Sequence, residues 1–139
     1  MTRGSARWKR FMWGGLAAHG TLVLLIATLA YQGALWSYLP AIPHFDLAGH
    51  FVLIGGLAFF LDGVLGYRPL TRGSPSWLRM APVLILSLAA AEEVAQAWTP
   101  QRTSSVSDFL ADVVGVLGLS WLSFWLAGRA GTAVAHDRG

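Results

Sequence analysis

Most of the acidic residues in this sequence lie at the ends of long apolar segments, together with one histidine. Ionisable side chains are costly inside segments that cross a bilayer, and by default they mark functional sites. Carboxylates beside an imidazole can carry out acid–base chemistry, hold a metal ion or bind a cation. The residues of this polar group are Asp46, His50, Glu92, Glu93, Gln96, Arg102, Asp108 and Asp112.

Two pairs in this group have the spacing of neighbours on one helix face. Asp46 and His50 are four residues apart, and they share a face if the helix already includes Asp46. Asp108 and Asp112 have the same spacing, and Gly115 continues their face. Each pair therefore opens an apolar segment with two polar side chains on one side.

The remaining members lie between those apolar segments and just before the break at Pro100. Gln96 is three residues from Glu93 and four from Glu92, so either glutamate can share a helix face with it. Glu92 and Glu93 are about 100° apart around a helix, so we expect one of them to face the polar group. Arg102 follows in the short turn and is the one obligate cation among these residues.

Composition places the chain among integral membrane proteins. It has 139 residues, of which 55% are hydrophobic and 12% charged, whereas soluble domains carry about 25% charged residues. There are no cysteines, which excludes disulfides and thiolate chemistry. The net charge is +3, but the basic residues flank apolar runs, so we expect no nucleic-acid partner.

These patterns predict an all-α fold, a polytopic membrane protein with four transmembrane helices in a small bundle and a single domain over residues 1–139. About 20 helical residues cross the roughly 30 Å hydrocarbon core of a bilayer. We expect the last helix to be capped by Ser105 or Ser107. The expected spans are residues 11–30, 47–65, 80–98 and 108–127.

The distribution of basic residues predicts the orientation. They gather in residues 1–10 and 67–79, whereas the connections at 31–46 and 99–107 hold only Arg102. The positive-inside rule then places both termini in the cytoplasm. The polar group would lie in the outer leaflet, open to the extracytoplasmic face.

Several of these polar residues also have structural interpretations. Asp108 at a helix start can act as a cap or form an ion pair with Arg102. His19, inside the first span, is expected to be packed or solvated rather than functional. Asp62 is expected to anchor the second span at the interface, with Arg68 as its partner.

The glycines favour close helix packing over ligand binding. Gly49, Gly55 and Gly56 give the second span a small-residue surface. Gly115 and Gly118, with Ala111, give the fourth span a similar surface. Close contact between membrane helices is the expected result.

At the polar residues the chain resembles the VanZ-like family of small bacterial membrane proteins. The family pattern has Asp and, four positions later, His at the start of a span, then Glu-x-x-Gln, a turn with Pro and Arg, and an Asp followed by a polar residue and glycines. This chain departs from it at Leu47, where Lys is usual, and at Asp112, where Asn is usual. The matching residues are Asp46, His50, Glu93, Gln96, Pro100, Arg102, Asp108, Asp112, Gly115 and Gly118.

The resemblance implies a four-helix protein of the bacterial cytoplasmic (inner) membrane. The namesake of the family is linked to low-level resistance to the glycopeptide teicoplanin, so the resemblance implies a role in antibiotic resistance or the cell envelope. The two departures make this site more acidic than the family pattern.

Three functions fit the polar group. The first is binding of an amphiphilic or lipid-linked envelope ligand with a cationic head and an apolar tail, without catalysis. The alternative is a membrane enzyme acting on lipid head groups through His50, Asp46, Glu93 and Asp112. A divalent cation held by Glu93, Asp108 and Asp112 is compatible with either, and no other cofactor is expected. A proton or solute pathway fits least well, because the polar residues do not cross the bilayer.

Overall fold

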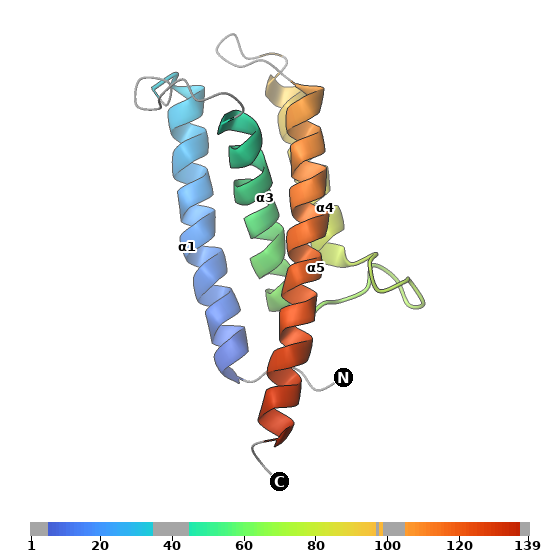
Figure 1. Cartoon of the computed structure of the whole chain (residues 1–139). Helices are drawn as coiled ribbons and strands as arrows, with labels where there is room; N and C mark the ends of the chain where they lie inside the picture. Colours follow the sequence, from blue (N-terminus) through green and yellow to red (C-terminus); the bar gives the residue numbers. More distant parts are fainter. Residues whose placement is uncertain (1–5, 35–44, 97, 99–104, 137–139) are drawn as a thin grey trace.

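The computed structural model describes residues 6–34, 45–96, 98 and 105–136. Within these ranges the chain forms an elongated bundle in which α3 contacts each of the other helices (Figure 1). The predicted all-α fold is confirmed. The described helices are α1 (Ala6–Tyr31), α3 (Phe45–Val64), α4 (Met80–Gln96) and α5 (Val106–His136).

Three of these helices are long and apolar enough to cross a bilayer: Ala6–Tyr31, Phe45–Val64 and the Val106–Arg129 part of α5. They make the chain a multi-pass integral membrane protein. The fourth, α4, has 17 residues, which gives it a length of about 25 Å. Large apolar side chains face outward, with Leu24 70% and Leu88 66% exposed, as expected for helices that are surrounded by lipid.

The two helices that open with acidic residues, α3 and α5, run in the same direction and touch at glycines. A Cβ atom on Gly55 would lie 2.7 Å from the carbonyl of Gly115, so a side chain has no room there. Two helical turns further on, the Ser123 hydroxyl donates to the Phe59 carbonyl at 2.9 Å. Gly118, which was expected to pack as well, has nothing within 4 Å of its Cβ direction. The small-residue contact is therefore centred on one glycine pair.

The first helix packs against α3 through His19. The His19 Nε2 atom lies 2.9 Å from the Leu53 carbonyl oxygen, and its ring lies 5.7 Å from that of Phe60. Gly56 leaves space for the imidazole, because a Cβ there would overlap the ring. The interpretation of His19 as a packed histidine is confirmed.

A buried ion pair lies at the C-terminal end of α3. Arg79 Nε donates to Asp62 Oδ2 at 2.7 Å, and the two side chains are 5% and 0% exposed. The same guanidinium donates to the Ser76 carbonyl and lies over the Phe124 ring at 5.1 Å. The prediction that Asp62 pairs with Arg68 is wrong: Arg68 is exposed. Arg79 directly precedes α4, so this ion pair fixes the start of α4 to α3.

Tyr67 connects three segments beside this ion pair. Its hydroxyl donates to the Ser123 carbonyl at 3.1 Å and accepts a hydrogen bond from Trp8 Nε1 at 3.2 Å. Burial raises the pKa of the Tyr67 phenol, so the hydroxyl stays protonated at neutral pH and keeps its donor role. The start of α1, the end of α3 and α5 are thus joined at this end.

Candidate functional site

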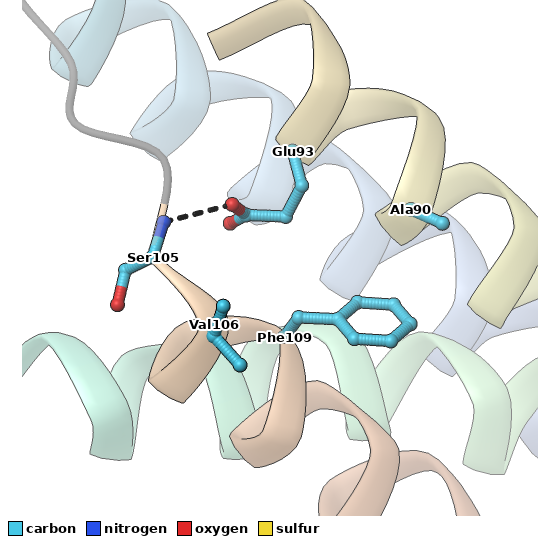
Figure 2. A pocket seen from close by; sticks show the side chains of 5 residues that line it. All are labelled: Ala90, Glu93, Ser105, Val106 and Phe109. Atoms are coloured by element: carbon cyan, nitrogen blue, oxygen red, sulfur yellow. Dashed lines mark hydrogen bonds between the residues drawn. The ribbon is translucent and has the colours of Figure 1, made fainter. Parts of the chain in front are cut away.

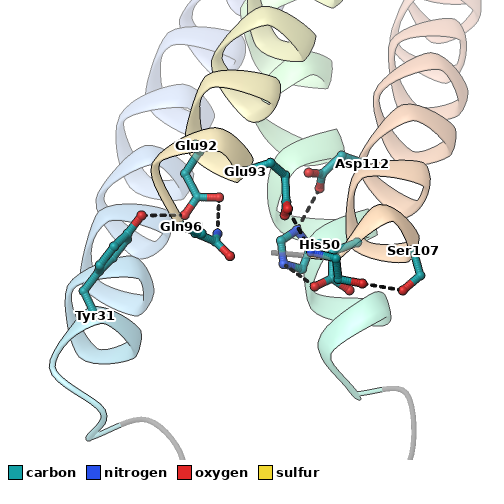
Figure 3. A network of polar contacts seen from close by, with 9 residues as sticks. Tyr31, His50, Glu92, Glu93, Gln96, Ser107 and Asp112 are labelled. Carbon is teal, nitrogen blue, oxygen red and sulfur yellow. Dashed lines mark hydrogen bonds and ion pairs between the residues drawn. The ribbon is translucent and has the colours of Figure 1, made fainter. Parts of the chain in front are cut away.

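The opposite end of the bundle holds the predicted polar group, with His50 at its centre (Figure 3). His50 Nδ1 donates to Asp112 Oδ1 at 3.1 Å, and His50 Nε2 lies 3.9 Å from Asp108 Oδ2. The imidazole from α3 thus lies between two carboxylates from α5. The helical spacing of Asp108 and Asp112 and the close packing of α3 and α5 together produce this arrangement.

The two carboxylates that contact His50 are buried. Asp112 is 2% and Asp108 9% exposed, so each carboxylate depends on protein groups to replace the water it has lost. Asp108 also lies in the first turn of α5, where the helix dipole favours a negative charge. A stabilising interaction of Asp108 with the helix dipole and its membership of the polar group are therefore compatible.

Glu93 connects α4 to the beginning of α5. Its Oε2 atom accepts a hydrogen bond from the Ser105 amide at 3.0 Å, and the residue is 8% exposed. The Ser105 carbonyl accepts hydrogen bonds from the amides of Asp108 and Phe109, which places Ser105 at the expected cap position of α5. Glu93 therefore satisfies an amide at a helix start, a structural role that its spacing alone did not reveal.

Glu92 and Gln96 lie on the other side of α4, toward α1 (Figure 3). Tyr31 donates to Glu92 Oε1 at 3.0 Å, and Gln96 Nε2 donates to Glu92 Oε2. As expected from the 100° angle between neighbours, one glutamate of the pair faces α5 and the other does not. The contact of Tyr31 with Glu92 was not predicted, because nothing in the spacing of the two residues connects them.

Asp46 makes no direct contact with these side chains. Asp46 lies in the first turn of α3 and is exposed; its charge acts on Asp108, but within the described ranges it makes no hydrogen bond or ion pair. Arg102 lies outside the described residues. The structure thus brings together His50, Asp108 and Asp112, with Glu93 reaching the same end from α4.

A hollow of about 240 Å³ lies beside this group, between α4 and α5 (Figure 2). Three of its lining residues are apolar: Ala90, Val106 and Phe109. Glu93 and Ser105, joined by their hydrogen bond, form its polar side. The hollow is smaller than the roughly 300–1,000 Å³ of most small-molecule sites, so it has room for only part of a ligand.

Among the residues that the structure describes, the charged side chains at this end are acidic, apart from His50. The carboxylates of Asp108, Asp112 and Glu92 all act electrostatically on His50, and a cation is the ligand that such a field favours. Within the described part of the chain, no group of three or more histidine or acidic residues is arranged to hold a metal ion. The described geometry therefore presents an imidazole that is hydrogen-bonded to a buried carboxylate.

Comparisons with known proteins give no match, whether to protein-family models, to curated proteins or to solved structures.

Proposed function

We propose that this protein is a VanZ-like, four-span protein of the bacterial inner membrane that binds an amphiphilic envelope ligand without catalysis. The ligand has a cationic head group, which the carboxylates bind, and an apolar tail, which lies against α4 and α5. Both termini face the cytoplasm, and the site opens to the extracytoplasmic side.

The observation that carries this proposal is the position of the hollow. Glu93 is the carboxylate that lines it, and with Ser105 it forms the polar side. Its apolar side includes Ala90 and Phe109, and Val94, four residues after Ala90 and so on the same side of α4, is an exposed apolar residue. An amphiphile needs this combination of a charged end and an apolar surface that continues into lipid.

Binding is tested with a matched pair of ligands. Purified protein in detergent is titrated with an alkyl chain that carries a quaternary ammonium head and with the same chain carrying a sulfate head, and thermal unfolding is recorded. The ammonium compound is expected to raise the unfolding temperature, since a ligand that binds the native state stabilises it. A shift of equal size with both compounds would contradict the proposal.

Variants locate the ligand. Ala90→Leu fills the hollow and is expected to abolish the shift. Ala91→Leu adds the same volume at an exposed position of the same helix and is the matched control. Glu93→Gln removes the charge on the polar side, with Glu92→Gln as its control, because Glu92 is bonded to Tyr31 and Gln96 instead.

A contribution to resistance against teicoplanin-type glycopeptides or to envelope homeostasis follows from the resemblance described above. Expression in a susceptible host is expected to raise the inhibitory concentration of teicoplanin, and Ala90→Leu is expected to remove the effect while membrane levels of the protein stay unchanged. If the Ala90→Leu protein raised the inhibitory concentration as much as the unchanged protein, resistance would not depend on the hollow.

The geometry of His50 supports a second candidate function, a membrane enzyme that acts on lipid head groups or lipid-linked precursors. A carboxylate that holds the ring in place, as Asp112 does, is the arrangement that general acid–base catalysis requires. Against it, Asp108 faces the other ring nitrogen, and a substrate would have to displace it.

Turnover distinguishes the two functions. Incubation with lipid-linked precursors followed by mass spectrometry reports any cleavage or transfer, and His50→Gln is expected to abolish an enzymatic reaction. In a binding protein, the same substitution is expected to change the affinity for the ammonium amphiphile only modestly and no product would form with either protein.

A further inference from the structure

The end of the bundle opposite the carboxylate group has exposed basic residues. The beginning of α1 meets the end of α3 here, since Trp8 bonds to Tyr67. Asp62, the described carboxylate at this end, is buried in its ion pair with Arg79 and does not neutralise the surface. The exposed cations in α1 and in the segment between α3 and α4 are Arg7, Lys9, Arg10, Arg68 and Arg72.

Two of these arginines belong to a folded hairpin, residues 68–79, between α3 and α4. The Leu70 amide donates to the Leu78 carbonyl at 3.0 Å, and the Met80 amide donates to the Arg68 carbonyl at 3.0 Å. At its tip the hydroxyls of Thr71 and Ser74 lie 2.6 Å apart. The segment therefore has a defined shape, and it extends sideways from the bundle beyond α4 (Figure 1).

The hairpin exposes apolar side chains next to its arginines. Trp77 is 67% and Leu70 40% exposed, and the side chains of Arg68 and Arg72 are exposed and form no ion pair with any described residue. Tryptophan and arginine together are typical of the boundary between lipid and water, where the indole lies among head groups and the guanidinium binds phosphate.

The short length of α4 places the hairpin at this boundary. Its 17 residues cover about 25 Å, less than the roughly 30 Å hydrocarbon core. Trp77 lies three residues before Met80, the first residue of α4. Trp77 therefore lies close to the membrane boundary at the start of α4, and a hairpin that extends sideways from the bundle there lies along the membrane surface rather than away from it.

We propose that the hairpin, residues 68–79, is a binding site for the head groups of anionic phospholipids. Arg68 and Arg72 bind the phosphates, while Trp77 and Leu70 lie among the upper parts of the acyl chains. Positive charge close to an anionic membrane surface contributes about a fivefold preference per arginine. The site lies at the other end of the bundle from the proposed amphiphile site and does not depend on it.

The probe is quenching of Trp77 by brominated lipids. The full-length protein is reconstituted in phosphatidylcholine vesicles that contain an equal fraction of either brominated phosphatidylglycerol or brominated phosphatidylcholine. The sequence has seven tryptophans, so the difference between the protein and its Trp77→Phe variant isolates the signal of Trp77. We expect stronger quenching of Trp77 by the anionic lipid, and weaker preference at high salt.

Charge-matched variants test the role of the arginines. Arg68→Gln/Arg72→Gln is expected to reduce the preference for the anionic lipid more than tenfold. Arg7→Gln/Lys9→Gln removes the same charge from exposed positions of α1 and is expected to leave most of the preference at Trp77. Equal quenching by the two lipids in the unchanged protein would overturn the proposal, as would no quenching by either, which indicates that another protein or a second copy covers Trp77.

Discussion

The imidazole of His50 on α3 donates a hydrogen bond of 3.1 Å to the carboxylate of Asp112 on α5, although 62 positions separate them in the chain. The donor comes from the first turns of one candidate span and the acceptor from the first turns of another. This contact joins the two parallel helices at the end that bears the carboxylates, as the Ser123 hydroxyl does nearer the other end.

The coupling between His50 and Asp112 is measurable by a double-mutant cycle with His50→Ala and Asp112→Ala. Hydrogen bonds between membrane helices are worth about 0.6 kcal/mol on average and at most about 1.7 kcal/mol, and this buried pair is expected near the upper figure. Unfolding in mixed micelles gives the four free energies. Additive effects of the two substitutions would show that the contact adds no stability.

Replacement of Gly55 by alanine is expected to destabilise the bundle. The new Cβ would lie 2.7 Å from the Gly115 carbonyl, and overpacking of this kind costs about 1–3 kcal/mol. Gly118→Ala is the matched control, because its Cβ meets nothing within 4 Å and alanine favours helix by up to about 1 kcal/mol. Thermal unfolding in detergent is expected to move in opposite directions for the two variants.

Removal of one partner from the buried ion pair of Asp62 and Arg79 is expected to be costly. Asp62→Leu leaves the Arg79 guanidinium buried at 5% exposure without its carboxylate, and such a change costs about 3–5 kcal/mol. The double variant Asp62→Leu/Arg79→Met is expected to recover most of this loss. Failure of the second substitution to restore stability would mean that Arg79 acts mainly through Ser76 and Phe124.

The hydrogen bond from the Ser105 amide to Glu93 is expected to protect the start of α5. Glu93→Ala removes the acceptor, and loss of an acceptor at a helix start costs about 0.5–2 kcal/mol. Hydrogen exchange at Ser105 and the amides that follow is expected to accelerate, while exchange near Ser123 stays unchanged. Val94→Ala, at an exposed neighbouring position, is the control.

Tyr67→Phe removes a hydroxyl that bonds to both Trp8 and Ser123. The expected loss is about 1 kcal/mol, the usual net value of a hydrogen bond. Trp8→Phe removes one of the same contacts, so the two effects are expected to be less than additive. Unfolding midpoints of the two single variants and the double variant check this, and full additivity would indicate that the bond does not form.

The positions of the helices, and which end of each helix carries the polar group, could be predicted from the local sequence. Hydropathy is a sum over neighbouring residues, so it located all four described helices to within a few residues at most ends. The exceptions were α1, which begins at Ala6 because its basic first turn is still helical, and α5, which extends to His136. Helical periodicity also placed Asp108 and Asp112 on the face that receives His50.

The partners of the buried charges did not follow from the sequence. Asp62 pairs with Arg79 and not with Arg68, because the hairpin turns the nearer arginine outward. Glu92 meets Tyr31 across a separation of 61 positions. Spacing within one helix fixes which side chains share a face, but it carries no information on the depth or rotation of the next helix.

The sequence by itself therefore determined an apolar chain of helical segments with most of its acids at one end and most of its bases at the other. Only the tertiary structure decided that α3 and α5 meet along Gly55 and Gly115 and so bring His50 between two carboxylates. The physical reason is that charge and hydropathy act at each residue, whereas a hydrogen bond requires two helices to approach at one rotation and one depth.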